Sequence, residues 1–454
     1  MIPKLYLGMI FAMCVGALPV ESALAESRTW TDATGNYKVV AELASVKGPE
    51  VTLRTSAGRV IVIEIKKLCE ADQAIVKKRF PPPGRPARDR RAAAPKRSAS
   101  IEEQLRQSKQ VDIARAPLKE LTAELSREFN AKIFVDRRAL EGIGISDRTD
   151  IGPVQGSYSL SDSLDSVAAD TDLRWTVCRD IVVVTSRGDI TKYYRPAVFR
   201  LSGRSTAKTV HERVLKEVQP KTWEYRGGMA TAVPYGQSIL VINHDWRTIA
   251  EIEKRFSAVM RRSVGKLVAK TKIEKALATP VTVDFRFTGL SKCCAELERQ
   301  IGIEFEIDRK SLEEIGITED VPVIAQFEST RLDTVLDLIL GQLSLAWSVE
   351  NGKFQIISGQ EEEHRLLTID HDVTQIVLQD PRLRMVDFDS LQHATTNVIA
   401  LGSWNLLGGP ASIQPGQMGG RSFTMKVLQS YRAHRAIEKL YADLRAAGTK
   451  NIRR

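Results

Sequence analysis

The stretch IFVDRRALEGIGI, Ile133–Ile145, recurs 172 residues later as FEIDRKSLEEIGI, Phe305–Ile317. The two stretches align without a gap, and the alignment continues outward on both sides. About twenty positions are identical over some 75 residues. Self-similarity of this length at one fixed offset predicts the internal duplication of a whole domain.

The shared aspartates predict a repeated turn. Asp136 and Asp308 each follow an apolar run typical of a strand and precede a helical run that ends at Gly144 or Gly316. An aspartate in this place caps a helix by accepting hydrogen bonds from free N–H groups of its first turn, and glycine is typical of helix ends. We therefore expect capping, with the following arginine on the surface. A catalytic role for the repeated Asp-Arg pair is the alternative.

A second region extends the duplication. Residues 193–260 and 366–444 share a tryptophan, a glycine pair and a proline, with a four-residue insertion in the later copy. Both regions alternate in β-α-β-β-α order. The duplicated unit is therefore two small α/β domains long. Trp175 and Trp347 occupy equivalent strand positions and are expected in the core. Trp223 and Trp404 adjoin glycines in a predicted loop and are candidate partner contacts.

The N-terminus reads as a targeting segment. Lys4 precedes the apolar run LYLGMIFAMCVGAL, which is followed by SALA. This pattern predicts a signal peptide, residues 1–25, cleaved after Ala25, and hence a periplasmic or extracellular protein. An uncleaved anchor is the alternative. No later segment has the apolar length of a membrane helix.

A small barrel is predicted over residues 26–79. Alternating apolar residues begin at Tyr37, a strand follows at residues 51–53 and another at 60–65, and a helix begins near Cys69. The runs WTDATGNYKVVAEL, GRVIVIEIKKL and EADQAIV resemble the Sla homology domain of endocytic adaptor proteins, an SH3-like barrel. The resemblance implies binding of short peptides containing Asn-Pro-Phe. It also implies binding of cytoskeletal proteins, ubiquitin and identical chains.

The same resemblance indicates a peptide site. In the adaptor family, basic strand residues face the acidic end of the peptide. Arg54, Arg59 and Lys66 are the nearest candidates here. The alternative is that they are ordinary solvated residues of the strands.

A basic linker is predicted over residues 80–100. FPPPGRPARDRRAAAPKRSAS holds five arginines, one lysine and one aspartate, so it carries half of the chain's net charge of +10. Its prolines favour extended geometry. Such a segment fits anionic surfaces, and the expected location outside the cytoplasm argues against nucleic acid as its partner.

The duplicated region resembles the N-terminal modules of secretins and TonB-dependent receptors. VDFRFTGLSKCCAEL, IDRKSLEEIGI and RLDTVLDLILGQLSLAW resemble the secretin/TonB short N-terminal domain. The Trp-Gly-Gly stretch, SILVINHD and TIAEIEKRF resemble the ring-building secretin domain. The resemblance implies protein binding and ring stacking. The expected boundaries are 101–190 and 191–262 for the first copy, 263–272 for a linker, 273–360 and 361–446 for the second copy, and 447–454 for a basic tail.

The sequence offers no catalytic, cofactor or metal site. Its six histidines have no zinc spacing, and no nucleotide or hydrolase motif stands in a suitable context. His364 and His371 are expected on opposite faces of one strand. Cys293 and Cys294 lie on one apolar helix face and are predicted core residues, with a redox or vicinal-disulfide role as the alternative.

The fold class expected is therefore multidomain: an SH3-like barrel followed by duplicated α/β modules. We expect a non-enzymatic envelope adaptor or scaffold, associated with a secretion or outer-membrane assembly, whose partners are envelope proteins, short peptides and further copies of itself. One alternative is an envelope enzyme subunit with an inter-domain site. A second is nucleic-acid binding through KH-like modules, against which the exported location and the absent GxxG argue.

Overall fold

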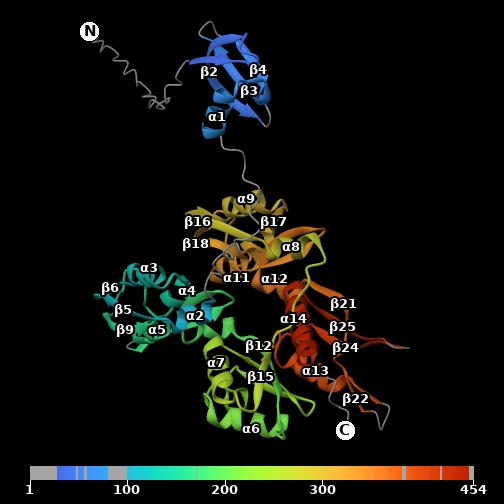
Figure 1. Ribbon diagram of the computed structural model, residues 1–454. Coiled ribbons are helices and arrows are strands. Elements are labelled where there is room, and N and C mark those ends of the chain that lie inside the picture. The colour runs from blue at the N-terminus through green and yellow to red at the C-terminus, as the bar shows by residue number, and fades with distance from the viewer. Residues whose placement is uncertain are drawn as a thin grey trace, which may run out of the picture. The chain divides into compact units, whose positions relative to one another are not determined.

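The computed structural model describes residues 28–47, 50–55, 59–79, 100–169, 171–380, 385–419 and 422–448 (Figure 1). The chain divides into two compact units, residues 1–97 and 98–454. The expected signal peptide, all of the expected linker except Ser100, and residues 449–454 of the expected tail lie outside the described residues. Within the described part of the chain, no helix is both long and apolar enough to cross a membrane.

The first unit is an antiparallel sheet of order β1-β2-β3-β4 with one helix. Its core holds Trp30, whose indole donates to the carbonyl of Ala41 at 3.0 Å. The first strand was not among the expected ones. The expected alternation began one residue early, because Tyr37 is exposed in a turn where its N–H donates to Asp32. The elements are β1 Arg28–Thr31, β2 Lys38–Lys47, β3 Glu50–Thr55, β4 Val60–Glu64, η1 Ile65–Lys67 and α1 Glu70–Arg79.

The second unit begins each copy with the same elements, here called module A1 (residues 101–186) and module A2 (residues 272–358). In both, a β-hairpin pairs with one parallel strand, giving the orders β10-β11-β7 and β19-β20-β17. A1 contains α2 Ile101–Arg106, β5 Ser108–Ile113, β6 Ala116–Pro117, α3 Leu118–Phe129, β7 Lys132–Val135, α4 Arg137–Glu141, β8 Asp150–Ile151, β9 Val154–Ser159, α5 Leu160–Ala169, β10 Leu173–Cys178 and β11 Ile181–Ser186. A2 contains α8 Lys272–Ala278, β16 Pro280–Gly289, α9 Leu290–Ile301, β17 Phe305–Ile307, α10 Arg309–Glu313, β18 Pro322–Arg331, α11 Leu332–Gln342, β19 Leu345–Glu350 and β20 Lys353–Ser358.

Each A module is followed by a sheet covered by two helices, here called module B1 (residues 195–263) and module B2 (residues 366–447). The sheet orders are β13-β14-β12-β15 and β24-β25-β21. After η2 Asp189–Tyr193, B1 contains β12 Arg195–Leu201, α6 Ala207–Glu217, η3 Glu224–Arg226, β13 Thr231–Tyr235, β14 Ile239–His244, α7 Trp246–Arg255 and β15 Met260–Ser263. After α12 Gly359–His364, B2 contains β21 Leu366–Asp372, β22 Leu378–Asp380, β23 Met385–Asp387, α13 Phe388–Thr396, η4 Asn405–Leu407, β24 Ser412–Gly419, β25 Ser422–Ser430 and α14 Tyr431–Ala447.

Two local expectations are wrong. The segment 263–272 is not wholly a linker, because Ser263 closes β15 and Lys272 opens α8. His364 ends helix α12, so it does not share a strand with His371. In both cases a short element occupies residues whose local sequence shows no clear period.

Candidate interaction sites

The repeated aspartates cap helices, as predicted. Oδ1 of Asp136 accepts from the N–H of Ala139 at 3.3 Å, and Oδ1 of Asp308 accepts from the N–H of Ser311 at 3.2 Å. The second carboxylate oxygen has a further partner that the sequence did not suggest. In each copy this second oxygen accepts a hydrogen bond from the residue 57 positions later, at the start of the connection to the B module.

These further partners occupy equivalent positions at the offset of 172 but differ in type. In the first copy, the hydroxyl of Tyr193 donates to Oδ2 of Asp136 at 2.8 Å. Burial next to this carboxylate raises the pKa of Tyr193. In the second copy, the guanidinium of Arg365 donates to Oδ2 of Asp308. One capping carboxylate therefore fastens each A module to the segment that follows it.

The arginines next to the caps are held in surface ion pairs. Arg137 lies 2.8 Å from Asp147, and Arg309 lies 2.7 Å from Glu319. The acidic partners also correspond at the offset of 172. Arg137 is only partly exposed, because its guanidinium also donates to the carbonyl of Ile324 in module A2 at 3.2 Å.

A second shared feature, here called the Trp–Asp–Arg joint, fastens each A module to its B module. In the first copy, the indole of Trp175 donates to Asp165 at 2.8 Å, and Arg247 lies 2.7 Å from that carboxylate and over the indole ring. In the second copy, Trp347 donates to Asp337 at 3.0 Å, and Arg432 follows at 3.4 Å. Both tryptophans are buried, which confirms the predicted core role of Trp175 and Trp347.

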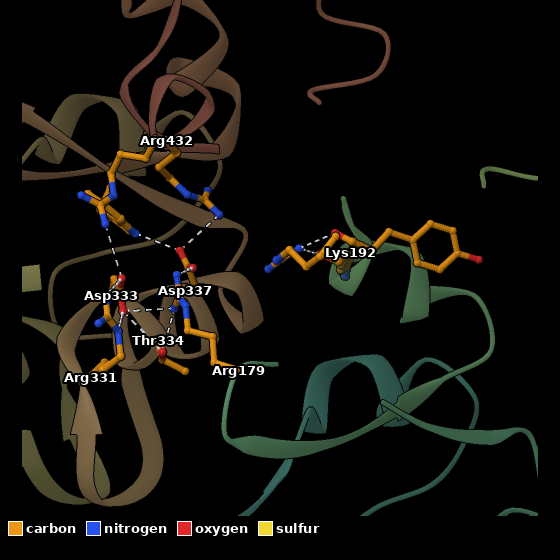
Figure 2. Close-up of polar contacts among 11 residues, drawn as sticks. Arg179, Lys192, Arg331, Asp333, Thr334, Asp337 and Arg432 are labelled. Carbon is orange, nitrogen blue, oxygen red and sulfur yellow. Dashed lines mark hydrogen bonds and ion pairs between the residues drawn. The ribbon is translucent and has the colours of Figure 1, made fainter. Parts of the chain in front are cut away.

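The second joint receives one residue that the first does not (Figure 2). Arg179, at the tip of the A1 hairpin, lies 3.1 Å from Asp333 and 3.7 Å from Asp337. Its guanidinium also donates to the hydroxyl of Thr334 at 2.7 Å. Burial alone would raise the pKa of Asp337, but Arg432 and Arg179 together lower it below its ordinary value. Arg179 therefore links the two copies by ion pairing.

The A1–A2 contact also has an apolar part, besides hydrogen bonds from Lys132 and Arg138 to backbone carbonyls of module A2. The outer face of the A1 sheet packs into the same core cluster as module A2 through four side chains, Phe134, Cys178, Ile181 and Val183. The ring of Phe134 stacks on Phe327 with centroids 5.5 Å apart. At the same strand positions module A2 carries polar residues instead, namely Glu306, Glu350, Lys353 and Gln355. Glu306, Glu350 and Gln355 line an open hollow.

The two candidate partner tryptophans are buried, so that prediction is wrong. Trp223 and Trp404 are both 0% exposed. Their indoles donate to the carbonyls of Val218 at 2.7 Å and Ile399 at 2.8 Å. A side chain enclosed on all sides cannot contact a partner. Each tryptophan instead anchors its loop to the core.

The exposed residues of these loops lie directly after the tryptophans. Leu406 and Leu407 are each 65% exposed in B2, and Tyr225 is exposed in B1. The glycine pairs shape the turn of each loop. Gly408 has φ of +88°, and a Cβ on Gly409 would overlap the backbone carbonyl of Ser403. The sequence signal for this surface was the apolar pair inside a glycine-rich turn.

The three candidate basic residues of the first unit lie on or beside strands β3 and β4. Arg54 on β3 lies directly opposite Val60 on β4, and Arg59 precedes that valine. Val60 and Val62 are exposed on the same outer face. Lys66 does not join them.

Lys66 lies beyond the other end of β4, a strand of five residues that spans roughly 15 Å. Its ammonium is 2.9 Å from Glu64. The hydrogen bond from Lys66 lowers the pKa of that carboxyl. Of the three candidates, Arg54 is the one that lies opposite an exposed valine on the outer face.

The described residues contain no group of three or more metal-ligating side chains. Cys293 and Cys294 are free and buried on α9, which confirms the predicted core role. Burial raises the pKa of each thiol to about 12, so neither is a ready nucleophile. A buried pair that the sequence did not suggest is His371 and His434, whose ring nitrogens lie 2.8 Å apart.

Residues 21–80 match the family described as SLA1 homology domain 1. The matched segment includes every described residue of the first unit, and a match to this domain suggests protein binding. A comparison with curated proteins finds no match.

Proposed function

We propose that the chain is an exported, non-enzymatic adaptor or scaffold that binds protein segments through its barrel. The match of residues 21–80 to a protein-interaction domain carries this proposal. The position of Arg54 opposite exposed Val60 supports it, since this surface offers apolar contact and positive charge side by side. The duplicated modules, which resemble secretin N-terminal domains, would form the scaffold.

The polar clusters of the modules also favour a scaffold over an enzyme. The carboxylates of the Trp–Asp–Arg joints are paired with arginine and indole groups that tie modules together. Groups so paired lack the free acid or base that proton transfer requires. The proposal places the protein in the bacterial envelope, associated with a secretion or outer-membrane assembly.

A peptide titration tests the barrel. The probe is a labelled peptide with an Asn-Pro-Phe core and an acidic end, added to the full chain without residues 1–25. Arg54→Glu together with Arg59→Glu should weaken binding about tenfold or more, because two attractive charges become repulsive. Lys67→Glu with Lys310→Glu is the control for equal charge change elsewhere. Equal weakening by both pairs, or no binding by the unmodified chain, would refute the proposed site.

Export is tested separately by N-terminal sequencing of the protein made in a bacterial host with its full leader. A mature N-terminus at Glu26 in the periplasmic or culture fraction is expected. Recovery of Met1 in the cytosolic fraction would refute it and leave the peptide-binding proposal standing.

A further inference from the structure

Module B1 has a strand that module B2 lacks. In B1, strand β15 pairs antiparallel with the outer edge of β12, with Val198 opposite Ser263 and Arg200 opposite Arg261. Two backbone hydrogen bonds show which residues of β12 direct their N–H and C=O groups towards which neighbouring strand. Leu201 donates to Ser238 on the β14 side, whereas Ser202 donates to Val259 on the β15 side. The even-numbered residues of β12 therefore point their backbone groups at β15.

In B2 the corresponding residues are helical. Helix α7 begins at Trp246 and α14 at Tyr431, an offset of 185 at which β15 corresponds to residues 445–448. Those residues are the end of α14 and its cap. Among the described residues, no strand pairs with the outer edge of β21, which is the last strand of its sheet (Figure 1).

The orientation of β21 can be assigned in the same way. Val373 donates to the carbonyl of Phe423, so odd-numbered residues face β25. The backbone groups of Thr368, Asp370 and Asp372 therefore face away from the sheet. Asp372 and Asp370 are the residues equivalent to Arg200 and Val198, which hold β15 in the first copy.

An edge of this kind is a template for pairing with another chain. In β12 one of the residues whose backbone faces the outer edge is Pro196, which has no N–H to donate. In β21 the equivalent residue is Thr368, which has one. One carbonyl of the edge is already engaged, since Arg445 donates to the oxygen of Asp372 at 2.6 Å. The N–H groups of this edge face no strand within the described residues.

We propose that the outer edge of β21 binds an extended, basic segment of a partner protein as an added antiparallel strand. The side chains of Asp370 and Asp372 are exposed on that edge and attract positive charge. The strand that fills the same edge in B1 is itself basic, with Arg261 and Arg262. Backbone pairing supplies affinity in this mode of recognition, and alternate side chains supply specificity.

A second copy of β21 is the less suitable occupant. Two β21 strands paired antiparallel about Ile369 would set Asp370 of each chain beside Thr368 of the other. Four carboxylates would then lie along one two-stranded ribbon, and like charges on neighbouring strands destabilise pairing. The charge of the edge favours a basic partner. The inference rests on B2 alone and is independent of the barrel.

The first test uses the sequence of the strand that fills this edge in B1 as a probe. A labelled peptide SAVMRRSV, residues 257–264, is titrated into the chain beginning at Glu26, and fluorescence anisotropy is followed. In the B1 register, the N–H of Arg261 faces the edge and that of Arg262 faces away. N-methylation at Arg261 should weaken binding about tenfold or more, since it removes a hydrogen bond and adds a clash. N-methylation at Arg262 should leave binding within about twofold.

Protein variants locate the site and separate the occupants. Asp370→Lys should weaken binding of the unmethylated peptide, whereas Glu251→Lys, on an exposed turn of α7, should not. Both variants should melt as cooperatively as the parent chain. Equal binding of the two methylated peptides would overturn the proposal. Peptide binding that appears only after residues 449–454 are removed would also overturn it, because that segment would then be the occupant of the edge. A dimer of the chain that the peptide dissociates would overturn it as well, because a second copy would then be the occupant.

Discussion

At the scale of single residues, each capping aspartate has partners in two elements. Oδ1 accepts from the first turn of a helix, and Oδ2 holds Tyr193 in one copy or Arg365 in the other. The sequence predicted the first contact, because a cap is local and Asp, helix and Gly lie within ten residues. It could not predict the second, since the partner is 57 residues away and its residue type differs between copies.

This geometry predicts unequal costs for removing the caps. Asp136→Ala should lose about 0.5–2 kcal/mol for the cap, and a further 1–3 kcal/mol, roughly, for the hydroxyl of Tyr193 left buried without its acceptor. Asp308→Ala should cost less, because Arg365 is partly exposed and keeps Glu361 at 2.9 Å. Urea unfolding of the full chain measures the difference.

The asparagine variants are the matched controls. Asn retains a carbonyl oxygen for the cap, so Asp136→Asn and Asp308→Asn should each restore most of the stability lost in the alanine variants. If asparagine costs as much as alanine while a partner interaction disappears, the aspartates have a binding role and the capping account fails.

The histidine pair predicts a dependence of B2 stability on pH. His434 shares its Nε2 proton with the carbonyl of Leu367 at 2.8 Å, which leaves Nδ1 to accept from His371. Burial, His434 and Arg445 lower the pKa of His371 to about 4. Burial also lowers the pKa of His434. The unfolded chain therefore binds more protons than the folded chain below pH 6.5.

The stability contributed by neutral histidines should thus be present above about pH 6.5 and decline as the pH falls towards 4, by about 3 kcal/mol for His371. The first copy supplies the control, because Phe199 and Ile249 occupy the equivalent positions. The double variant His371→Phe and His434→Ile should flatten the melting temperature between pH 6.5 and 4 relative to the parent. Parallel pH profiles for the two proteins would refute the assignment.

At the scale of elements, the duplication made most helices and strands predictable, since amphipathic periods recur at one offset. The elements that differ between the two copies were harder to predict from the sequence. Residues 260–263, MRRS, form strand β15, whereas residues 445–448, RAAG, at the offset of 185, are the end of helix α14 and its cap. The second segment has two alanines, which favour helix, and the first is flanked by the β-branched residues Val259 and Val264. That signal was present, but the assumption of equivalent copies concealed it.

The prediction that Trp223 and Trp404 contact a partner failed for a different reason. A tryptophan beside glycines is compatible with exposure or anchoring, and only packing decides between them. The glycines give a test. Gly408→Ala should cost about 1 kcal/mol through its positive φ. Gly409→Ala should cost several times more, because the new Cβ would overlap the carbonyl of Ser403.

Differential scanning calorimetry of the two variants checks this order. Leu406→Ser in the same loop is the control for a surface change, since its side chain is mostly exposed, and should leave the melting temperature nearly unchanged. A Gly409→Ala protein as stable as the parent would show that the loop relaxes freely and that Trp404 does not fix it.

At the scale of the whole second unit, the two copies stack in one direction only. The A1 sheet presents an apolar outer face to A2, whereas the A2 sheet presents glutamates, a lysine and a glutamine at the same positions. Terminal modules of stacked arrays commonly carry such polar outer faces, which stop further stacking. The sequence showed the duplication but not this contact, because the residues that form it are those that differ between the copies.

Exchange of one residue between the two faces tests this asymmetry. Phe134→Glu places the A2 residue in the A1 face, where it loses the stack on Phe327 and buries a charge. We expect a loss of about 2–4 kcal/mol and faster proteolysis of residues 264–271, which join the copies. The reciprocal change Glu306→Phe should leave stability nearly unaltered, since its position is exposed, but should promote concentration-dependent association through a new apolar patch. Unfolding and light scattering measure the two effects. If Phe134→Glu unfolds like the parent chain, the A1–A2 contact does not hold the copies together, and the polar face of A2 is no cap.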